Sequence, residues 1–296
     1  MPSVPGYVYA VRDNSVYINL FIQSDVTVDL DRGEVHLTQN TDYPWDGRVK
    51  ITVKPEKEAE FTLSLRIPGW ARNQPIPSNL YTYLDELEEE SSLYVNGEEQ
   101  PMKLDRGYVP IQRNWQKGDT IELNLPMPVR RVISHPEVEE NQGLVALQRG
   151  PIVFCAEWPD NNGHVFNLVL PDKNDLKAEF HQDLLNGVAV ITGKALALSE
   201  TGDGKTTNEN PQPFTAIPYY AWAHREPGEM AVWIAREKDK ARPLPQPTLA
   251  SQSRVTASGD KNASSVNDQW DPKDSNDHSH PYLHWWPNKG TLEWVQ

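Results

Sequence analysis

The 296-residue sequence predicts an all-β protein with two consecutive β-sandwich, jelly-roll-like domains followed by a truncated third β module. Apolar residues recur at about every second position through most of the chain. Residues that favour turns, mainly Gly, Pro, Asn and Asp, separate these runs. Residues 7–125 contain no run of helical length in which apolar residues recur every 3.6 positions. These observations favour stacked antiparallel sheets.

The first half has the pattern of paired strands. The runs YVYAV and VYINLFI flank Asp13 and Asn14, which favour a turn, so a β-hairpin is expected there. In RVKITVK, Val49, Ile51 and Val53 share one face while charged and polar residues occupy the other, as a sheet with one solvated face requires. Further strands are expected at GEVHLTQ, EFTLSLRIP, SLYVNGEEQ, GYVPIQR and DTIELNLP.

Turn and loop signals lie between these strands. Asn96-Gly97 suits a type I′ turn because both central residues need positive φ, and WQKGDT predicts another tight turn. The acidic run at 84–92 is expected to form a solvated loop.

A second block of strands is expected over residues 132–234. Its members are GLVALQRGPIVFCAE, HVFNLVLP, GVAVITGKALAL, FTAIPYYAWAH and MAVWIA. The segment TGDGKTTNENPQP is rich in turn formers and is expected to be an exposed loop.

These patterns predict four segments. Residues 1–128 form the first β-sandwich domain, 129–240 the second, 241–250 a proline-rich linker, and 251–296 an incomplete third β-sandwich. The last segment is shorter than the roughly 60 residues at which an isolated all-β core becomes viable, so part of this module is expected to lie outside the chain.

Composition restricts the partners. The formal net charge of -14 argues against nucleic-acid and anionic-membrane surfaces, because both would repel an acidic protein. No apolar run approaches the roughly 18 residues of a membrane span, and the first residues lack the features of a secretory signal. The compartment stays open between the cytoplasm and a periplasmic or secreted location, since a signal peptide could precede Met1.

Cysteine and metal signals are sparse. The single cysteine, Cys155, excludes an internal disulfide, and its apolar setting favours a buried inert thiol over a nucleophile. Near the C-terminus, acidic and histidine side chains crowd together without any recognised ligand spacing, so no metal site is predicted. The members of this cluster are Asp274, Asp277, His278, His280 and His284.

Aromatic side chains are the main candidates for a binding site. An aromatic ring can stack on a sugar ring while nearby polar groups bond the hydroxyls, although aromatics more often fill cores and seams. Glu157, after an apolar strand, is the carboxylate singled out for sugar contact, against a structural alternative. The aromatic candidates are Trp45, Trp70, Trp285 and Trp286, with Trp270 as a further one.

Several ordered segments carry a family resemblance. SVPGYVYA, VYINLFIQSD, TDYPWDGRVKITV, FTLSLRIPGWA, LYVNGE, WQKGDTIELNLPMPVRRV and GLVALQRGPIVFCAE resemble the C-terminal half of glycoside hydrolase family 127, the β-L-arabinofuranosidase-type enzymes. The similarity covers residues 3–235 and includes, in the first ten or so residues, what resembles the end of a preceding barrel. The tail from Val255 is similar to the start of a galactose-binding-like, discoidin-type domain.

The resemblance implies where the chemistry resides. In this family an N-terminal (α/α)6 barrel acts by a retaining mechanism, with a zinc-bound cysteine thiolate as nucleophile and a glutamate as acid/base. The zinc ligands are further cysteines and a glutamate of that barrel. Cys155 matches none of these cysteines, so no catalytic residue carries over to this chain, and zinc is expected only in the barrel.

Two function hypotheses follow from the resemblance and the candidate residues. The first is that the chain is the non-catalytic β-sandwich part of a glycosidase that hydrolyses non-reducing terminal β-L-arabinofuranosides in plant glycans, and that it is inactive without the barrel. Its partners would then be that barrel and, through the enzyme, an arabinose-containing glycan. The alternative is a free-standing carbohydrate-binding module without hydrolytic activity.

Overall fold

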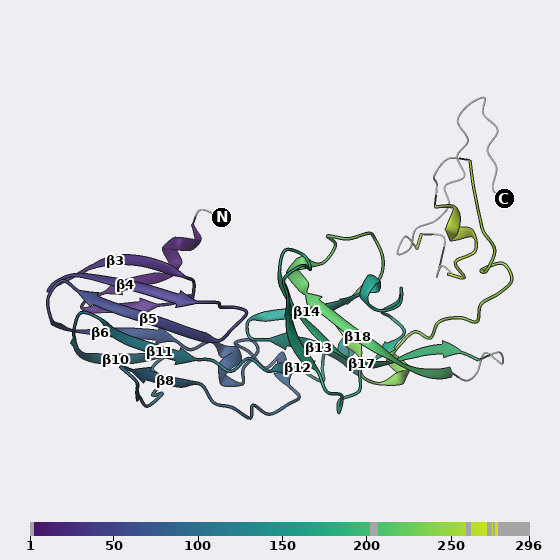
Figure 1. Cartoon of the computed structure of the whole chain (residues 1–296). Helices are drawn as coiled ribbons and strands as arrows, with labels where there is room; N and C mark the ends of the chain where they lie inside the picture. The colour runs from purple at the N-terminus through teal and green to yellow at the C-terminus, as the bar shows by residue number, and fades with distance from the viewer. Residues whose placement is uncertain (1–2, 202–206, 259–261, 271–273, 275, 278–296) are drawn as a thin grey trace. The chain divides into compact units, whose positions relative to one another are not determined.

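The computed structural model describes residues 3–201, 207–258, 262–270, 274 and 276–277 (Figure 1). These residues form β-strands and short 3-10 turns, so the all-β prediction is confirmed. No helix in this described part is long and apolar enough to cross a membrane. The chain divides into two compact units, Met1–Ala197 with Pro211–Arg242, and Leu198–Asn210 with Pro243–Gln296.

The first half of the larger unit has two sheets that share one core. The four-stranded sheet has the order β1-β2-β6-β10, with β2 and β6 parallel and the other pairs antiparallel. The six-stranded sheet has the order β3-β4-β5-β11-β8-β9 and is antiparallel throughout. The strands are β1 (Tyr9–Arg12), β2 (Ser15–Ile18), β3 (Ser24–Leu30), β4 (Gly33–Thr41), β5 (Arg48–Pro55), β6 (Ala59–Arg66), β8 (Ser92–Val95), β9 (Glu98–Glu99), β10 (Tyr108–Trp115) and β11 (Asp119–Asn124).

The predicted turns are confirmed. Arg12 pairs with Ser15 across a two-residue turn in which Asp13 has a φ of 53°. Asn96 and Gly97 have φ values of 52° and 81°, the positive pair that a type I′ turn requires.

Side-chain alternation places the core between these two sheets. Val49, Ile51 and Val53 are at most 1 % exposed, while Arg48 and Lys50 on the opposite face are exposed. On the facing sheet, β6 and β10 bury apolar residues in the same way. The Trp115 ring is fully buried, and its Nε1–H donates a hydrogen bond to the Phe61 carbonyl at 3.0 Å. The two sheets therefore form a sandwich with one apolar interior.

The second half of the larger unit is built from ten strands in the order β19-β14-β18-β17-β15-β20-β13-β12-β7, with β16 paired to β17. Of β17 it contains the residues up to Ala197, and of β18 the residues from Pro211. A further pairing between β13 and β14 closes part of this path into a ring. The strands are β7 (Tyr81–Tyr83), β12 (Val129–Ser134), β13 (Leu144–Arg149), β14 (Ile152–Glu157), β15 (Leu168–Val169), β16 (Lys177–His181), β17 (Val188–Glu200), β18 (Thr207–Pro218), β19 (Met230–Ala231) and β20 (Ile234–Ala235).

Strand β7 joins the two halves, because it precedes residue 128 in sequence but pairs with β12. The Arg130 guanidinium of β12 lies 3.9 Å from the centroid of the Tyr83 ring, and its Nη2 donates to the Asn73 side chain at 2.8 Å. Burial lowers the pKa of Arg130 and raises that of Tyr83 to about 12. The Tyr83 hydroxyl donates to Gln148 at 3.0 Å.

Several elements differ from the expected pattern. None of the expected strand segments contains β3, β7, β12 or β16, although Val26, Val28 and Leu30 alternate regularly in β3. The expected loop 201–213 is wrong over Thr207–Pro213, because β18 begins at Thr207 and pairs with β17. The boundary at 128/129 stays a prediction.

The smaller unit has little regular structure in its described residues. Ser199 forms an isolated parallel bridge with Leu244, and a 3-10 turn spans Ala263–Val266. The Asn267 side chain donates to the carbonyls of Ala250 and Ser253 at 2.8 Å. The prediction of a discoidin-type domain beginning at 251 stays a prediction, because most of residues 271–296 lie outside the described part of the chain.

Candidate functional site

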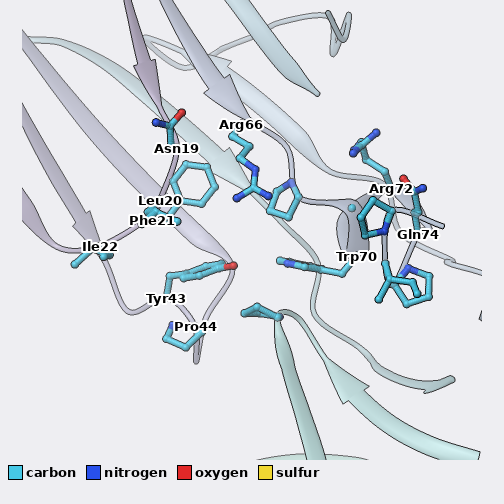
Figure 2. Close-up of a pocket in the computed structure, with 16 residues that line it drawn as sticks. Asn19, Leu20, Phe21, Ile22, Tyr43, Pro44, Arg66, Trp70, Arg72 and Gln74 are labelled. Atoms are coloured by element: carbon cyan, nitrogen blue, oxygen red, sulfur yellow. The ribbon is translucent and has the colours of Figure 1, made fainter. Parts of the chain in front are cut away.

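A pocket of about 560 Å³, lined by residues of the first sandwich and by Pro151 of the second half, includes Trp70, one of the predicted site residues (Figure 2). Its wall combines aromatic and proline side chains with a few polar groups, and Ile22 at its edge is 42 % exposed. The residues that line it are Asn19, Leu20, Phe21, Ile22, Tyr43, Pro44, Arg66, Pro68, Gly69, Trp70, Arg72, Gln74, Pro75, Ile76, Pro77 and Pro151. Such a lining suits the apolar face of a ligand or of another protein surface.

Trp70 is held by a short 3-10 turn, Gly69–Arg72, that follows β6 and Pro68. Gly69 is required in this turn, since a Cβ there would lie 2.8 Å from the Gln74 carbonyl oxygen. The Gln74 N–H donates to the Gly69 carbonyl at 2.9 Å, which closes the segment on itself. The turn therefore presents the indole from a fixed backbone.

Tyr43 faces Trp70 across the pocket (Figure 2). Its ring packs edge-on against Phe21, with centroids 5.8 Å apart. Burial raises the pKa of the Tyr43 hydroxyl, and the indole N–H of Trp70 and the charge of Arg66 oppose that rise. The Trp70 Nε1 is itself buried and faces the Tyr43 hydroxyl, but it makes no hydrogen bond of normal geometry within the described part of the chain. A buried donor without an acceptor is costly, so this indole suits an incoming acceptor.

Trp45 belongs to the same loop as Tyr43, yet contacts the second half of the unit. Its ring centroid lies 5.7 Å from that of Phe180 and 6.5 Å from that of Tyr220. The Arg149 guanidinium donates to the Trp45 carbonyl at 3.0 Å. Trp45 is therefore a half-buried seam residue, and Tyr220 beside it is 59 % exposed.

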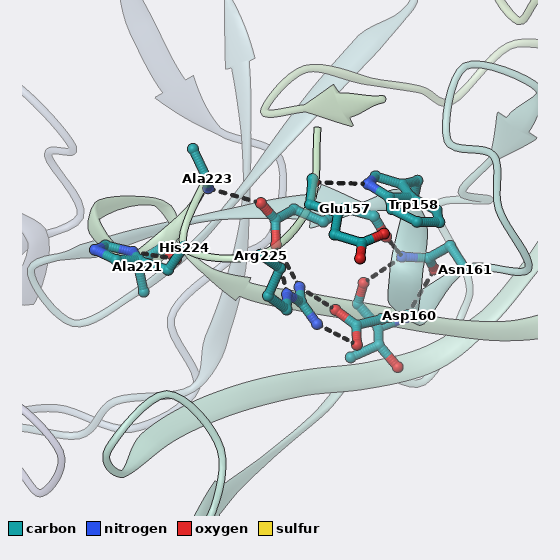
Figure 3. Close-up of polar contacts among 10 residues, drawn as sticks. Glu157, Trp158, Asp160, Asn161, Ala221, Ala223, His224 and Arg225 are labelled. Carbon is teal, nitrogen blue, oxygen red and sulfur yellow. Dashed lines mark hydrogen bonds and ion pairs between the residues drawn. The ribbon is translucent and has the colours of Figure 1, made fainter. Parts of the chain in front are cut away.

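Glu157 lies at the end of β14 with 5 % exposure and is held by charged and backbone donors (Figure 3). Its Oε1 accepts the Ala223 N–H at 2.9 Å, and its Oε2 accepts from Nε of Arg225 at 3.1 Å and from Nη2 of the same residue. The same guanidinium donates to both Asp160 oxygens, at 2.8 and 2.6 Å. Both Glu157 oxygens are thus engaged in a structural network.

The charges of this network also act on the neighbouring Cys155 thiol. Hydrogen bonds to Asp160 raise the pKa of Arg225 further, against the effect of its burial, and Glu157 adds to the rise. Cys155 is fully buried, and burial together with the nearby carboxylates raises its pKa to about 12. A thiol with this pKa is protonated at neutral pH, whereas a nucleophile or zinc ligand must be a thiolate.

The remaining candidates lie at the C-terminus. Trp285 and Trp286 lie outside the described residues, as do three members of the acidic and histidine cluster, His278, His280 and His284. Among the residues that the structure does describe, no group of three or more His, Cys, Asp or Glu side chains is arranged to hold a metal ion. The described residues of this chain therefore do not offer the ligand set of the zinc centre that the resemblance implies for the barrel.

The structure does not bring the predicted residues that it describes into one site. Trp70 lines the pocket of Figure 2, Trp45 packs against the second half of the unit, and Glu157 lies in a separate network of that half. The sequence analysis missed Tyr43 and Arg225. Tyr43 stands two positions before Trp45 in YPWDG, which is a usable signal, whereas Arg225 is 68 positions from Glu157 and has none.

Comparisons with known proteins show which family the chain resembles. Residues 15–127 match the family model described as the β-L-arabinofuranosidase, GH127 middle domain, and residues 129–235 match the glycoside hydrolase family 127 C-terminal domain. The non-reducing end β-L-arabinofuranosidase of Bifidobacterium longum subsp. longum is 34 % identical over 253 residues, which cover 79 % of this chain and 35 % of that protein.

Two solved structures are similar in both sequence and fold. The GH127 β-arabinofuranosidase BT3674 superposes with a TM-score of 0.79 at 40 % identity, covering 82 % of this chain and 38 % of that one. Ara127N-Se, a GH127 β-L-arabinofuranosidase from Geobacillus stearothermophilus T6, gives a TM-score of 0.70 at 41 % identity, covering 79 % and 35 %. The chain thus spans little more than a third of the length of these relatives.

Proposed function

Because the chain belongs to glycoside hydrolase family 127, we propose that it is the non-catalytic β-sandwich part of a glycosidase that acts on β-L-arabinofuranosides. The parent reaction is retaining hydrolysis of non-reducing terminal β-L-arabinofuranosides in plant glycans, carried out by an (α/α)6 barrel that contains the zinc. The match of both sandwiches to middle and C-terminal domain models, in relatives almost three times as long, is the observation that carries the proposal.

The chemistry of the described residues favours a non-catalytic role. Covalent glycosidase chemistry needs a free nucleophile and a free acid/base. Cys155 is buried and protonated, and both oxygens of Glu157 are occupied by fixed donors. Glu157 cannot approach a sugar without breaking the network shown in Figure 3, and Cys155 has no exposed surface.

The pocket around Trp70 is the surface proposed to meet the catalytic domain. It combines an exposed Ile22, a half-buried indole and a buried indole N–H that makes no hydrogen bond of normal geometry in the described part of the chain. A second protein surface would remove the apolar atoms from water and supply an acceptor to that N–H.

A domain-exchange experiment tests the proposal. The part of the Bifidobacterium longum enzyme outside the matched region is produced alone and fused to this chain, and each product is assayed on 4-nitrophenyl β-L-arabinofuranoside. The fusion is expected to be more soluble and more active than the isolated part, and Trp70→Ala is expected to reduce that gain. Equal activity and solubility of the isolated part and the fusion would contradict a supporting role.

The free-standing carbohydrate-binding module is the alternative, and the aromatic lining of the same pocket favours it. Under that alternative Trp70 would stack on a sugar ring. Titration of the chain with arabinose-containing oligosaccharides separates the two hypotheses. A binding module should bind these sugars and lose that affinity in Trp70→Ala, and its fusion to the catalytic part should change neither activity nor solubility.

A further inference from the structure

The outer face of the six-stranded sheet carries a second, polar pocket of about 510 Å³. Strand register determines its floor, because Asn40 pairs with Lys50, Lys50 with Glu122, and Glu122 with Tyr94. These four residues therefore form one row across β4, β5, β11 and β8, on the face opposite the buried residues. All four residues belong to the first sandwich, and none of them lines the Trp70 pocket.

A second row and a loop complete the pocket. Arg48 pairs with Asn124, which pairs with Ser92, two residues along each strand from the first row. The loop that contains Asp42 and Asp46 adds a wall at the end of the sheet. That loop is held against the end of β11, where the Leu125 N–H donates to the Gly47 carbonyl at 3.0 Å and a Cβ on residue 47 would lie 1.8 Å from the Leu125 oxygen.

The charged side chains of the pocket hold each other in place. Lys50 Nζ lies 2.8 Å from Glu122 Oε1, and Arg48 makes a forked contact with Asp46, with Nη2 to Oδ2 at 2.7 Å and Nε to Oδ1 at 3.1 Å. Both pairs remain partly exposed, so their unused N–H groups and lone pairs are available to a ligand. Groups oriented before binding lose less entropy when a ligand arrives.

The mixture of groups selects the class of ligand. Two cations, three carboxylates and two amides alternate within a few residues, so a phosphate would meet carboxylates and a divalent cation would meet Arg48 and Lys50. A sugar hydroxyl both donates and accepts and carries no charge, so it can use either kind of group. The half-buried Tyr94 supplies an aromatic side chain beside Glu122.

We propose that this outer face, centred on Tyr94, Glu122 and Asn124, is a binding site for a neutral oligosaccharide. Its volume falls within the range of about 300–1,000 Å³ that small-molecule sites occupy. The site does not depend on the proposed catalytic partner or on the Trp70 pocket, because every residue of it lies in the first sandwich.

Isothermal titration of the whole chain tests the site with four trisaccharides: arabinotriose, xylotriose, cellotriose and the charged trigalacturonate. At least one neutral trisaccharide is expected to bind, and trigalacturonate is expected to bind more weakly. Tyr94→Ala is expected to weaken binding by about tenfold or more. Burial and stacking of one aromatic ring on a ligand contribute a binding free energy of that order. Tyr94→Phe keeps the ring and is expected to keep most of the affinity.

Matched controls locate the binding. Lys54→Ala changes an exposed residue on the same strand and face but outside the pocket, and Trp70→Ala changes the other pocket, so neither should alter the affinity. Asn124→Ala should weaken it and provides a second variant if Tyr94→Ala does not fold. No binding of any neutral trisaccharide at 10 mM (roughly the weakest affinity of interest), or binding that survives both Tyr94→Ala and Asn124→Ala, would overturn the site. Either result would leave the proposed non-catalytic role in the glycosidase standing, because that role is tested by the activity of the fusion and not by sugar binding.

Discussion

The Trp45 ring packs against the Phe180 ring, with centroids 5.7 Å apart and planes at 58°. The two residues come from a loop between β4 and β5 and from strand β16, so this contact connects the first sandwich to the second. The adjacent hydrogen bond from Arg149 to the Trp45 carbonyl adds a polar link across the same seam. A sugar-contacting role for Trp45 stays a prediction, whereas a seam role is visible in its contacts.

Replacing Trp45 should therefore destabilise the unit. Trp45→Ala is expected to lower the free energy of unfolding by about 1–3 kcal/mol, less than a fully buried tryptophan because the ring is half-buried. Trp45→Phe should cost less than about 1.5 kcal/mol, since it keeps an aromatic ring. Urea denaturation measures both values, and an unchanged midpoint for Trp45→Ala would contradict the seam role.

The network around Glu157 should be structural. Glu157→Gln keeps an acceptor for the Ala223 N–H but leaves Arg225 with Asp160 as its one carboxylate in the network, at an expected cost of about 1–3 kcal/mol. Asp239→Asn, an exposed change in the same unit, is the matched control and should cost less than about 0.5 kcal/mol. Thermal unfolding compares them. A Glu157→Gln protein of normal stability that has lost sugar affinity would instead place Glu157 in a binding site.

The ion pair between His164 and Glu229 in the second sandwich should weaken at both low and high pH. The hydrogen bond to Glu229 raises the pKa of His164, with Nδ1 and Oε1 3.2 Å apart. Burial alone would raise the pKa of Glu229, but hydrogen bonds from His164 and from the N–H groups of Val165 and Phe166 outweigh it and lower the pKa.

The sign of the pH dependence follows from these two shifts. The contribution of His164 to the free energy of unfolding is fully present below its pKa in the unfolded chain, about 6.5. It is lost as the pH rises through the higher pKa of the folded chain. The Glu229 contribution is complete above its unfolded pKa of about 4.3 and is lost as pH falls through the folded value. Stability from this pair should therefore be greatest between about pH 4.3 and 6.5.

Because the His164 side chain is 46 % exposed, its pair is expected to be worth only about 0.2–1 kcal/mol. His164→Gln should remove the loss of stability on the alkaline side, while His181→Gln, which changes another exposed histidine, should not. Urea midpoints at pH 5.5 and 8 measure the difference. Identical pH profiles for the wild type and His164→Gln would show that this pair does not contribute.

The sequence predicted the architecture more completely than the site. The alternation of Val49, Ile51 and Val53 and the Asn96-Gly97 turn are local signals, so both were confirmed. Strand β7 has three residues and depends on pairing with β12 far along the chain, which a local pattern does not show. Likewise, Trp70 was identifiable by residue type, but the partner of Glu157 lies 68 positions away.

The thiol of Cys155 should be inert in the folded chain. It is fully buried with a pKa of about 12, and it is the single cysteine of the sequence. A thiol-specific dye at pH 8 is expected to label the native protein no faster than it unfolds and to label the urea-unfolded protein at once. Rapid labelling of the native protein would mean that Cys155 is accessible, and its exclusion as a nucleophile would fail.

These β-sandwiches are expected not to cleave the glycosidic bond themselves. The most direct test is the rate at which the purified 296-residue chain releases 4-nitrophenol from 4-nitrophenyl β-L-arabinofuranoside, with and without added zinc. We expect a rate equal to that of the buffer in both cases. Turnover above the buffer rate that disappears in Cys155→Ser or Glu157→Gln would contradict it.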